Sequence, residues 1–264
     1  MAHADLQTPG PHTPSSARIS NLWLGGSWHT PADEAAAAEL EQICPAVRQM
    51  AADSRLFGAR VTGWAASELR ISQFLDLGAG ASPGPPAAQV ARSVRPGAKV
   101  AYIDNDPEAA DWLADVMPGG SGEGIAVACT DLGRPAEVLS HPALAGVIDA
   151  TAPVAVLFGL VLHFWPPEDA AAIVAGYARL LAPGSVVAVS VPRVDDDLMW
   201  RRLAAVYPVP AWNFTPAEVL AAFEGLELVN PGVGAAFALR PGRFGVPCRR
   251  KGPAYVLAAI GRKR

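Results

Sequence analysis

The sequence predicts an α/β fold in which a mostly parallel sheet of seven strands has helices on both faces. From residue 73 onward, short apolar runs alternate with stretches of helical periodicity. This is the pattern of parallel strands joined by crossover helices. Proline and glycine occur at nearly every junction, as in Ala182-Pro183-Gly184. A long irregular loop separates the last two apolar runs, which predicts that a hairpin closes the sheet.

The expected elements follow one another in a regular order. The apolar runs that we interpret as strands cover residues 74–77, 99–103, 125–128, 154–158, 185–191, 226–229 and 254–260. The helical stretches cover residues 86–94, 107–116, 136–141, 167–181, 196–206 and 216–224. We therefore assign residues 71–264 to one sheet domain.

The segment before the sheet is expected to be helical. Residues 1–16 are rich in Pro, Ser, Thr and His and are interpreted as a flexible leader, and residues 17–70 as an N-terminal helical cap. Within the cap, residues 35–43 and 47–69 have the helical period. Thr30 provides a capping residue before Pro31 and two acidic residues, while Pro45 marks a break between helices.

Composition limits the classes of function. The 264 residues are 51% hydrophobic and 17% charged, enough for one well-filled domain with a modest accessory region. A net charge of −4 gives no overall attraction to nucleic acid, and we interpret the basic residues 249–251 and 262–264 as solvated ends. The N-terminus lacks the apolar run of a signal peptide or membrane span. We expect a cytoplasmic protein that binds neither nucleic acid nor membrane.

No metal site is expected. The three cysteines, Cys44, Cys129 and Cys248, are far apart and lack the paired spacing of zinc ligands. The acidic run 195–197 stands at the start of an expected helix, where carboxylates commonly cap the first turn and match the helix dipole.

A glycine turn followed by a second strand that ends in acid points to a nucleoside cofactor. Residues 73–84 read QFLDLGAGASPG, and residues 100–106 read VAYIDND. Gly78 and Gly80 allow positive φ and a close approach of backbone to ligand. Asp104 stands where an acid accepts hydrogen bonds from ribose hydroxyls. We interpret Asp106, which precedes a proline, as a helix N-cap.

A third strand end supplies another acid. Asp131 follows the run at 125–128 and is a candidate to face the adenine amino group. The candidate cofactor residues are Asp76, Gly78, Ala79, Gly80, Asp104, Asn105, Asp131, Leu132 and His163.

Two cofactors compete for this set, a dinucleotide and S-adenosylmethionine (SAM). A dinucleotide site needs Gly-x-Gly-x-x-Gly running directly into a helix. Here Pro83 occupies the third position of that pattern, Gly84 comes one residue late, and two further prolines remove amide donors that a pyrophosphate would use. Asp76 would repel a phosphate pair, but it would attract the amino group of a methionine moiety. The sulfonium cofactor is therefore favoured.

The chain resembles an S-adenosyl methyltransferase family of actinobacterial proteins, formerly a domain of unknown function. The matching segments are residues 14–19, 24–26, 73–80, 100–107, 161–166, 181–185, 223–229 and 260–263. They span almost the whole chain in order. The resemblance implies a class I methyltransferase (Rossmann-like) fold, with SAM as cofactor and S-adenosylhomocysteine (SAH) as product.

The chain also departs from the family pattern, as a diverged member would. The stretch around Gly25-Gly26 lacks the family's tyrosines, acid, Lys and Asn-Phe. The segment Pro85-Pro86-Ala87 replaces Asn-Val-His, and Ser190-Val191-Pro192 stands where Ser-His is usual. These changes fall where cofactor or substrate is handled, which leaves an altered substrate or lost catalysis as alternatives.

For catalysis, His163 is the candidate base, with a role in shaping the pocket as its alternative. His29 is a second candidate. Trp23, Trp28 and Trp212 are interpreted as packing residues. The preferred function is transfer of a methyl group to a small-molecule acceptor. The alternatives are a noncatalytic SAM-binding or scaffolding protein, and an NAD-dependent oxidoreductase.

Overall fold

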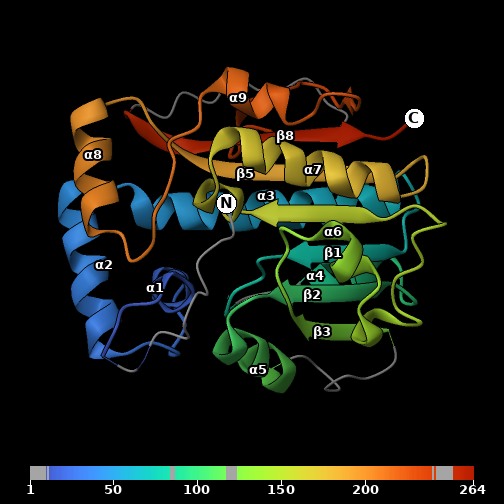
Figure 1. Ribbon diagram of the computed structural model, residues 1–264, viewed down its shortest axis with the longest axis horizontal. Coiled ribbons are helices and arrows are strands. Elements are labelled where there is room, and N and C mark those ends of the chain that lie inside the picture. Colours follow the sequence, from blue (N-terminus) through green and yellow to red (C-terminus); the bar gives the residue numbers. More distant parts are fainter. Residues whose placement is uncertain (1–9, 11, 84–86, 117–123, 240, 242–251) are drawn as a thin grey trace.

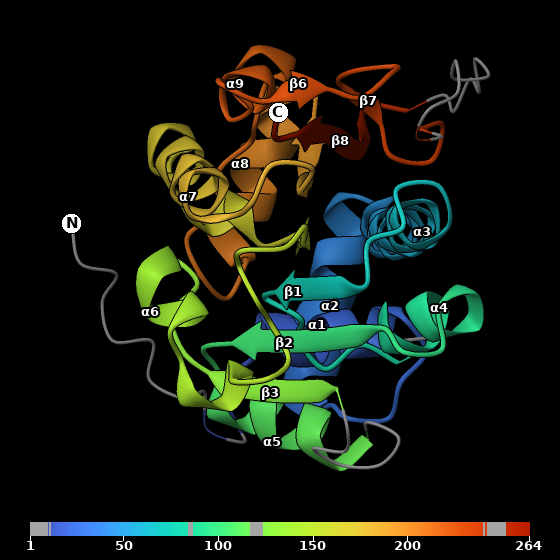
Figure 2. The same ribbon diagram turned by 90° about the vertical axis from the view of Figure 1, so that its right-hand side faces the viewer.

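The computed structural model describes residues 10, 12–83, 87–116, 124–239, 241 and 252–264. A twisted sheet forms the middle layer (Figure 1). In the view turned by 90°, α3 and α4 lie on one side of the sheet, and α6 and α7 lie on the other (Figure 2). This is the predicted α/β arrangement, with a mostly parallel sheet between two layers of helices.

The elements have the following bounds. The helices are α1 (Ser16–Trp23), α2 (Pro31–Ile43), α3 (Val47–Ser67), α4 (Ala87–Val94), α5 (Pro107–Val116), α6 (Pro135–Leu139), α7 (Pro167–Leu180), α8 (Asp197–Val206) and α9 (Pro216–Ala221). Two short 3-10 turns are η1 (Pro142–Leu144) and η2 (Leu162–Phe164). The strands are β1 (Gln73–Leu77), β2 (Lys99–Asp104), β3 (Ile125–Cys129), β4 (Ala155–Gly159), β5 (Val186–Val194), β6 (Glu227–Leu228), β7 (Gly234–Ala235) and β8 (Ala254–Arg262).

The sheet has eight strands, so the expected number of seven was wrong. Its order is β3-β2-β1-β4-β5-β8-β6, with β7 also paired to β8. The first five strands are parallel, and β8 runs antiparallel to β5, β6 and β7. The additional strand has only two residues, Gly234 and Ala235, so it carries no alternating pattern that a sequence can reveal. Its pairing depends on the neighbouring nine-residue β8.

Both faces of the central strands are buried, which explains their continuous apolar sequences. Every residue of β1 is buried. Leu75 and Leu77 belong to the core beneath α6 and α7, whereas Phe74 belongs to the core beneath α3 and α4. Because alternate side chains of a strand point to opposite faces, Asp76 lies on the same side as Phe74.

Helices α1, α2 and α8 lie beyond the carboxyl ends of the parallel strands (Figure 1). The predicted helix start at Thr30 is confirmed, because Thr30 and Asp33 form a reciprocal capping box. Asp196 caps α8 by accepting a hydrogen bond from the backbone N–H of Met199, which confirms its structural interpretation. Asp106 likewise accepts from the backbone N–H of Glu108 at the start of α5.

The buried side chain of Arg18 connects three helices. Its Nε donates to Asp33 of α2 at 2.8 Å, and its Nη1 donates to Glu108 of α5 at 3.0 Å. Asp33 is completely buried and also accepts from the backbone N–H of Ser15. A movement of α1 that broke these contacts would leave an uncompensated buried charge, which is strongly destabilising. The contacts therefore hold α1 in one position relative to the sheet.

No helix within the described residues is long and apolar enough to cross a membrane.

Several sequence features lie outside the described residues. They are most of the proposed leader, Pro85 and Pro86 of the replaced family segment, Cys248, and the basic residues 249–251.

Candidate functional site

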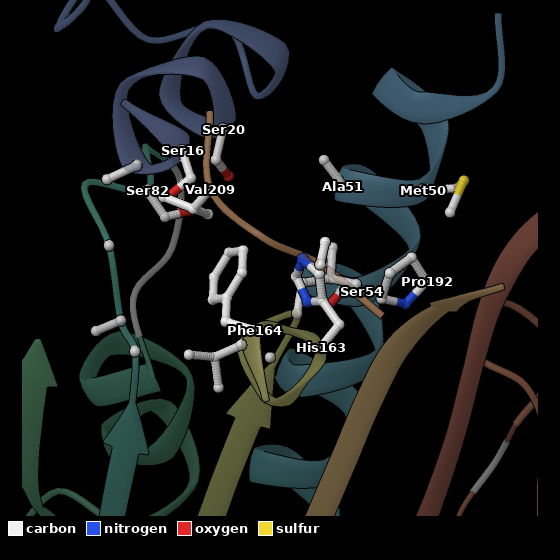
Figure 3. Close-up of a pocket in the computed structure, with 18 of the residues that line it drawn as sticks. Ser16, Ser20, Met50, Ala51, Ser54, Ser82, His163, Phe164, Pro192 and Val209 are labelled. Carbon is white, nitrogen blue, oxygen red and sulfur yellow. The ribbon is translucent and has the colours of Figure 1, made fainter. Parts of the chain in front are cut away.

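A cavity of about 1010 Å³ opens where β1, β2 and β4 end. Loops after these three strands form its floor, and its other walls include residues of α1, α2, α3, β5 and α8. Figure 3 shows His163 and Phe164 of η2, Ser54 of α3 and Pro192 of β5 around this space. All of the predicted cofactor residues except Asp131 line it, namely Asp76, Gly78, Ala79, Gly80, Asp104, Asn105, Leu132 and His163.

The glycine turn has the backbone that the sequence predicts. Gly78 has φ +67° and Gly80 has φ +55°, a region that side chains with a Cβ rarely occupy. A Cβ on Gly78 would also collide with the side chain of Val161, which follows β4. The backbone N–H groups of Gly78 and Ala79 donate to the carbonyl of Ile103 at 2.8 and 3.1 Å. The turn is thus held against the end of β2.

Asp104 belongs both to this turn and to the cavity wall. Its Oδ2 accepts from the backbone N–H of Gly80 at 2.8 Å, and its Oδ1 accepts from the N–H of Asp106 at 3.0 Å. The side chain is buried, and burial raises the pKa of its carboxyl although these two N–H groups oppose the effect. Each carboxylate oxygen has a further lone pair, which leaves acceptor capacity for ligand hydroxyls.

Asp76 and Arg55 form a separated pair of opposite charges beside the turn. Burial raises the pKa of the Asp76 carboxyl to about 6. The positive charge of Arg55 opposes this rise, and the negative charge of Asp104 adds to it. Both side chains line the cavity. The buried Nε of Arg55 has no hydrogen-bond partner in the described part of the chain. Unpaired buried donors are uncommon in folded proteins and call for an explanation.

His163 is held in η2, directly after β4. Its backbone carbonyl accepts from the N–H of Trp212 at 2.8 Å. Its ring lies 4.1 Å from that of Phe164 and 6.2 Å from that of Tyr207 between centroids. Burial lowers its pKa to about 3, so the imidazole is neutral at pH 7. Its buried Nδ1 has no partner among the described residues.

The remaining predicted residues, Asp131 and His29, do not line the cavity. The carboxylate of Asp131 accepts from the backbone N–H of Gly133 at 2.8 Å and is not among the residues that line the cavity. Its neighbour Leu132 does line it, so contact of this loop with adenine stays a prediction. His29 lies 3.2 Å from Glu34 and outside the cavity lining.

Comparison with known proteins decides the family. The model of the S-adenosyl methyltransferase family matches residues 2–264. The chain belongs to the S-adenosyl methyltransferase family. It is therefore a SAM-dependent methyltransferase, and the sulfonium cofactor that the sequence favours over a dinucleotide is confirmed.

Solved structures agree with this methyltransferase assignment. A DUF574 family protein from Streptomyces avermitilis is 31% identical, with a TM-score of 0.87 over 96% of this chain and 98% of that one. A protein from Thermobifida fusca described as a methyltransferase candidate is also 31% identical, with a TM-score of 0.87 over 99% and 100% of the two chains. Magnesium protoporphyrin IX methyltransferase from Synechocystis, solved with SAH, is 16% identical at a TM-score of 0.51 over 83% and 87%, which shows the fold alone. No curated protein matches the chain.

Segments where this methyltransferase departs from its family pattern contribute residues to the cavity lining. Ser20 and Trp23 of α1 line it, and so does Pro192 of β5. Asn21, next to Ser20, is buried, donates to the carbonyl of Ala81 at 2.6 Å and accepts from the N–H of Trp28. The diverged stretch thus retains a polar anchor between α1 and the glycine turn.

Sequence reasoning missed three residues that line the cavity. Arg55 and Ser54 are part of a long helix, and no local pattern shows which of its residues face the site. Leu160 has φ +52°, which costs about 1–2 kcal/mol for a residue with a Cβ. Its N–H donates to the carbonyl of Ser190 at 3.0 Å, which holds this strained backbone in the cavity wall. No sequence signal predicts such a conformation at a leucine.

Proposed function

We propose that the protein transfers the methyl group of SAM to a small-molecule acceptor bound in the same cavity, and releases SAH. One observation carries this proposal. Eight of the nine candidate cofactor residues, among them His163 with its neutral imidazole, border a single cavity, whose size is at the upper end of the roughly 300–1,000 Å³ of pockets for drug-sized ligands. That space accommodates a cofactor and a second small molecule.

The unsatisfied groups of the site fit the cofactor. Asp76 would bind the ammonium group of the methionine end, and Arg55 would bind its carboxylate, so the orphaned Nε gains a partner. Asp104 would accept hydrogen bonds from the ribose hydroxyls with the lone pairs that the backbone leaves open. The loop that contains Asp131 and Leu132 would contact adenine.

When bound, SAM supplies a methyl group that its sulfonium has already activated. The main tasks of the residues around the cavity are therefore to position the acceptor and to exclude water. Activation of the acceptor is a smaller task. His163 would accept a hydrogen bond from the acceptor, orient its nucleophilic atom, and take up the proton that this atom loses as the methyl–sulfur bond breaks and the new bond to the methyl group forms. The low pKa of this imidazole makes it a weak base before substrate binds.

The experiment measures binding and turnover on the same protein. SAM, SAH and NAD are titrated by calorimetry, and SAM-loaded protein is then incubated with small hydroxyl and amine compounds while methylated products are sought by mass spectrometry. We expect micromolar binding of SAM and SAH, no binding of NAD, and at least one methylated product. Binding without any product would favour the noncatalytic alternative, and absence of SAM and SAH binding would contradict the proposed site.

A further inference from the structure

The cavity continues beyond the cofactor residues into a second region with hydrocarbon walls. Residues of α2, α3, β5 and α8 form these walls, and we call the region the apolar chamber. Its residues are Leu40, Val47, Met50, Ala51, Val194 and Leu203. All six are at most 9% exposed. In Figure 3, Met50 and Ala51 project from α3 on the same side of the site as Pro192.

The proposed function assigns three charged groups of the cavity wall to the cofactor, including Arg55, which stands one turn after Ala51 on α3. Asp76, Asp104 and Arg55 belong to the cofactor side, where Asp76 interacts electrostatically with both of the others. Glu168 and Asp169 belong to the first turn of α7 and are exposed, so they stand where the cavity meets solvent. None of the six chamber residues carries a charge.

Three further polar residues of the cavity wall, Ser54, His163 and Tyr207, are uncharged. The hydroxyl group of Ser54 lies 2.8 Å from that of Ser190, and the two form a hydrogen bond. Burial raises the pKa of Tyr207 to about 12, so its hydroxyl is protonated, and burial keeps His163 neutral. Neutral imidazole can accept one hydrogen bond.

A charged ligand in such surroundings loses its hydration without gaining a partner. An unpaired buried charge is strongly disfavoured, whereas hydrocarbon surface gains free energy from leaving water. The exposed acids of α7 add repulsion against anions at the cavity entrance. The size of the cavity, its hydrocarbon walls and the acids at its entrance therefore all favour a small ligand that is apolar and uncharged.

We propose that the methyl acceptor is an uncharged, mainly apolar small molecule with one O–H or N–H group, which lies in the apolar chamber and donates a hydrogen bond to His163. This inference rests on the proposed function, because it assigns the second region of the cavity to the acceptor. It goes further in naming the chemistry that the acceptor must have.

The test uses three probes with the same ring system. They are β-naphthol, a β-naphthol sulfonate that keeps the hydroxyl group, and β-naphthyl methyl ether, which lacks the donor. Each probe is titrated by calorimetry into protein saturated with SAH. We expect β-naphthol to bind at least about tenfold more tightly than the sulfonate, because the anion has no partner in the chamber. The ether is expected to bind several-fold more weakly than β-naphthol, and His163→Ala to remove that difference.

A variant pair on α8 tests the charge argument directly. Ala204 is half-buried and lines the cavity, whereas its neighbour Ala205 is exposed and does not. Ala204→Lys is expected to tighten binding of the sulfonate by about tenfold, since a partly desolvated ion pair then becomes available. Ala205→Lys adds the same charge outside the cavity and is expected to leave all three affinities unchanged.

The outcomes separate this inference from the proposed function. Equal or tighter binding of the sulfonate to wild-type protein would overturn the inference, as would equal effects of the two lysine variants. If SAH binds and none of the probes does, the apolar chamber is not an acceptor site. If SAH itself fails to bind, the proposed function fails, and the same titrations on ligand-free protein still decide the charge preference of the chamber.

Discussion

At the scale of single residues, Asp104 gives the most direct test of the cofactor site. Asp104→Ala is expected to weaken SAH binding by about tenfold or more, because charged hydrogen bonds contribute about 1.5–3 kcal/mol. Calorimetry measures the change. Asp111→Ala on the exposed side of α5 is the control, since Asp111 does not line the cavity. An unchanged affinity in Asp104→Ala would remove this carboxylate from the site.

Arg55 is tested by a comparison of two ligands. Arg55→Gln should weaken SAH binding about tenfold and leave the affinity for methylthioadenosine unchanged, because that nucleoside lacks the carboxylate. Both affinities are measured by calorimetry. Arg48→Gln is the matched control, because Arg48 lies on α3 like Arg55 but forms a surface ion pair with Glu41 of α2. Equal losses for both ligands would indicate that Arg55 acts only by supporting the fold.

Asp76 predicts a pH dependence of cofactor affinity. Its pKa of about 6 in the free protein means that the carboxyl is protonated below that pH, while an ammonium partner requires the ionised form. SAH affinity should therefore fall by up to tenfold per pH unit below pH 6 and be level from there to about pH 8, where the ligand's own amino group titrates. Asp76→Asn should weaken binding and abolish the acidic fall. A wild-type affinity that is constant from pH 5 to pH 7 would contradict this role.

At the scale of elements, two glycines of the same turn are expected to differ. In Gly78→Ala, the alanine must adopt a positive φ, and its Cβ collides with the Val161 side chain. In Gly80→Ala, the alanine must also adopt a positive φ, but its Cβ points into open space. We expect Gly80→Ala to lower the free energy of unfolding by about 1–2 kcal/mol, and Gly78→Ala to lower it by at least 1 kcal/mol more. Urea unfolding of both variants measures the difference. Equal losses would show that the contact with Val161 relaxes without cost.

The elements were predictable where the chain repeats a strong local signal. The expected strand at 99–103 is β2, and the helix expected at 107–116 is α5, because buried parallel strands and capped helices leave apolar runs and Pro or Gly punctuation. Strand β7 left no such trace. The side chains that meet across the site were only partly predictable. Strand ends fix Asp76 and Asp104, whereas the direction of Arg55 depends on how α3 packs against the sheet, which is a tertiary property.

At the scale of the whole molecule, the buried imidazole predicts how stability changes with pH. His163 has a folded-state pKa of about 3 and an unfolded value near 6.5, so the unfolded state binds more protons between these pH values. The free energy of unfolding therefore falls as pH decreases through this window. Asp76, with a pKa raised from 3.8 to about 6, has the opposite effect between those two values.

A histidine variant separates these two contributions. Relative to wild type, His163→Leu should gain about 2 kcal/mol in the free energy of unfolding between pH 7 and pH 5, because it no longer has to keep an imidazole neutral. Urea unfolding at both pH values gives the difference between the two proteins. A constant difference would mean that His163 titrates near its ordinary pKa in the folded protein.

The apolar chamber has a consequence for how this enzyme can change during evolution. Leu40, Val47, Val194 and Leu203 both line the cavity and belong to the hydrophobic cluster that joins α2 to α8. Truncating such a leucine to alanine costs about 2–5 kcal/mol, a large part of the stability of a typical domain. New substrate preferences therefore arise more readily through half-buried positions such as Ala204, where a change of side chain leaves the cluster intact. The stability of the fold thus limits substitutions at the buried residues of the apolar chamber, whereas half-buried positions of the cavity wall can change with little loss of stability.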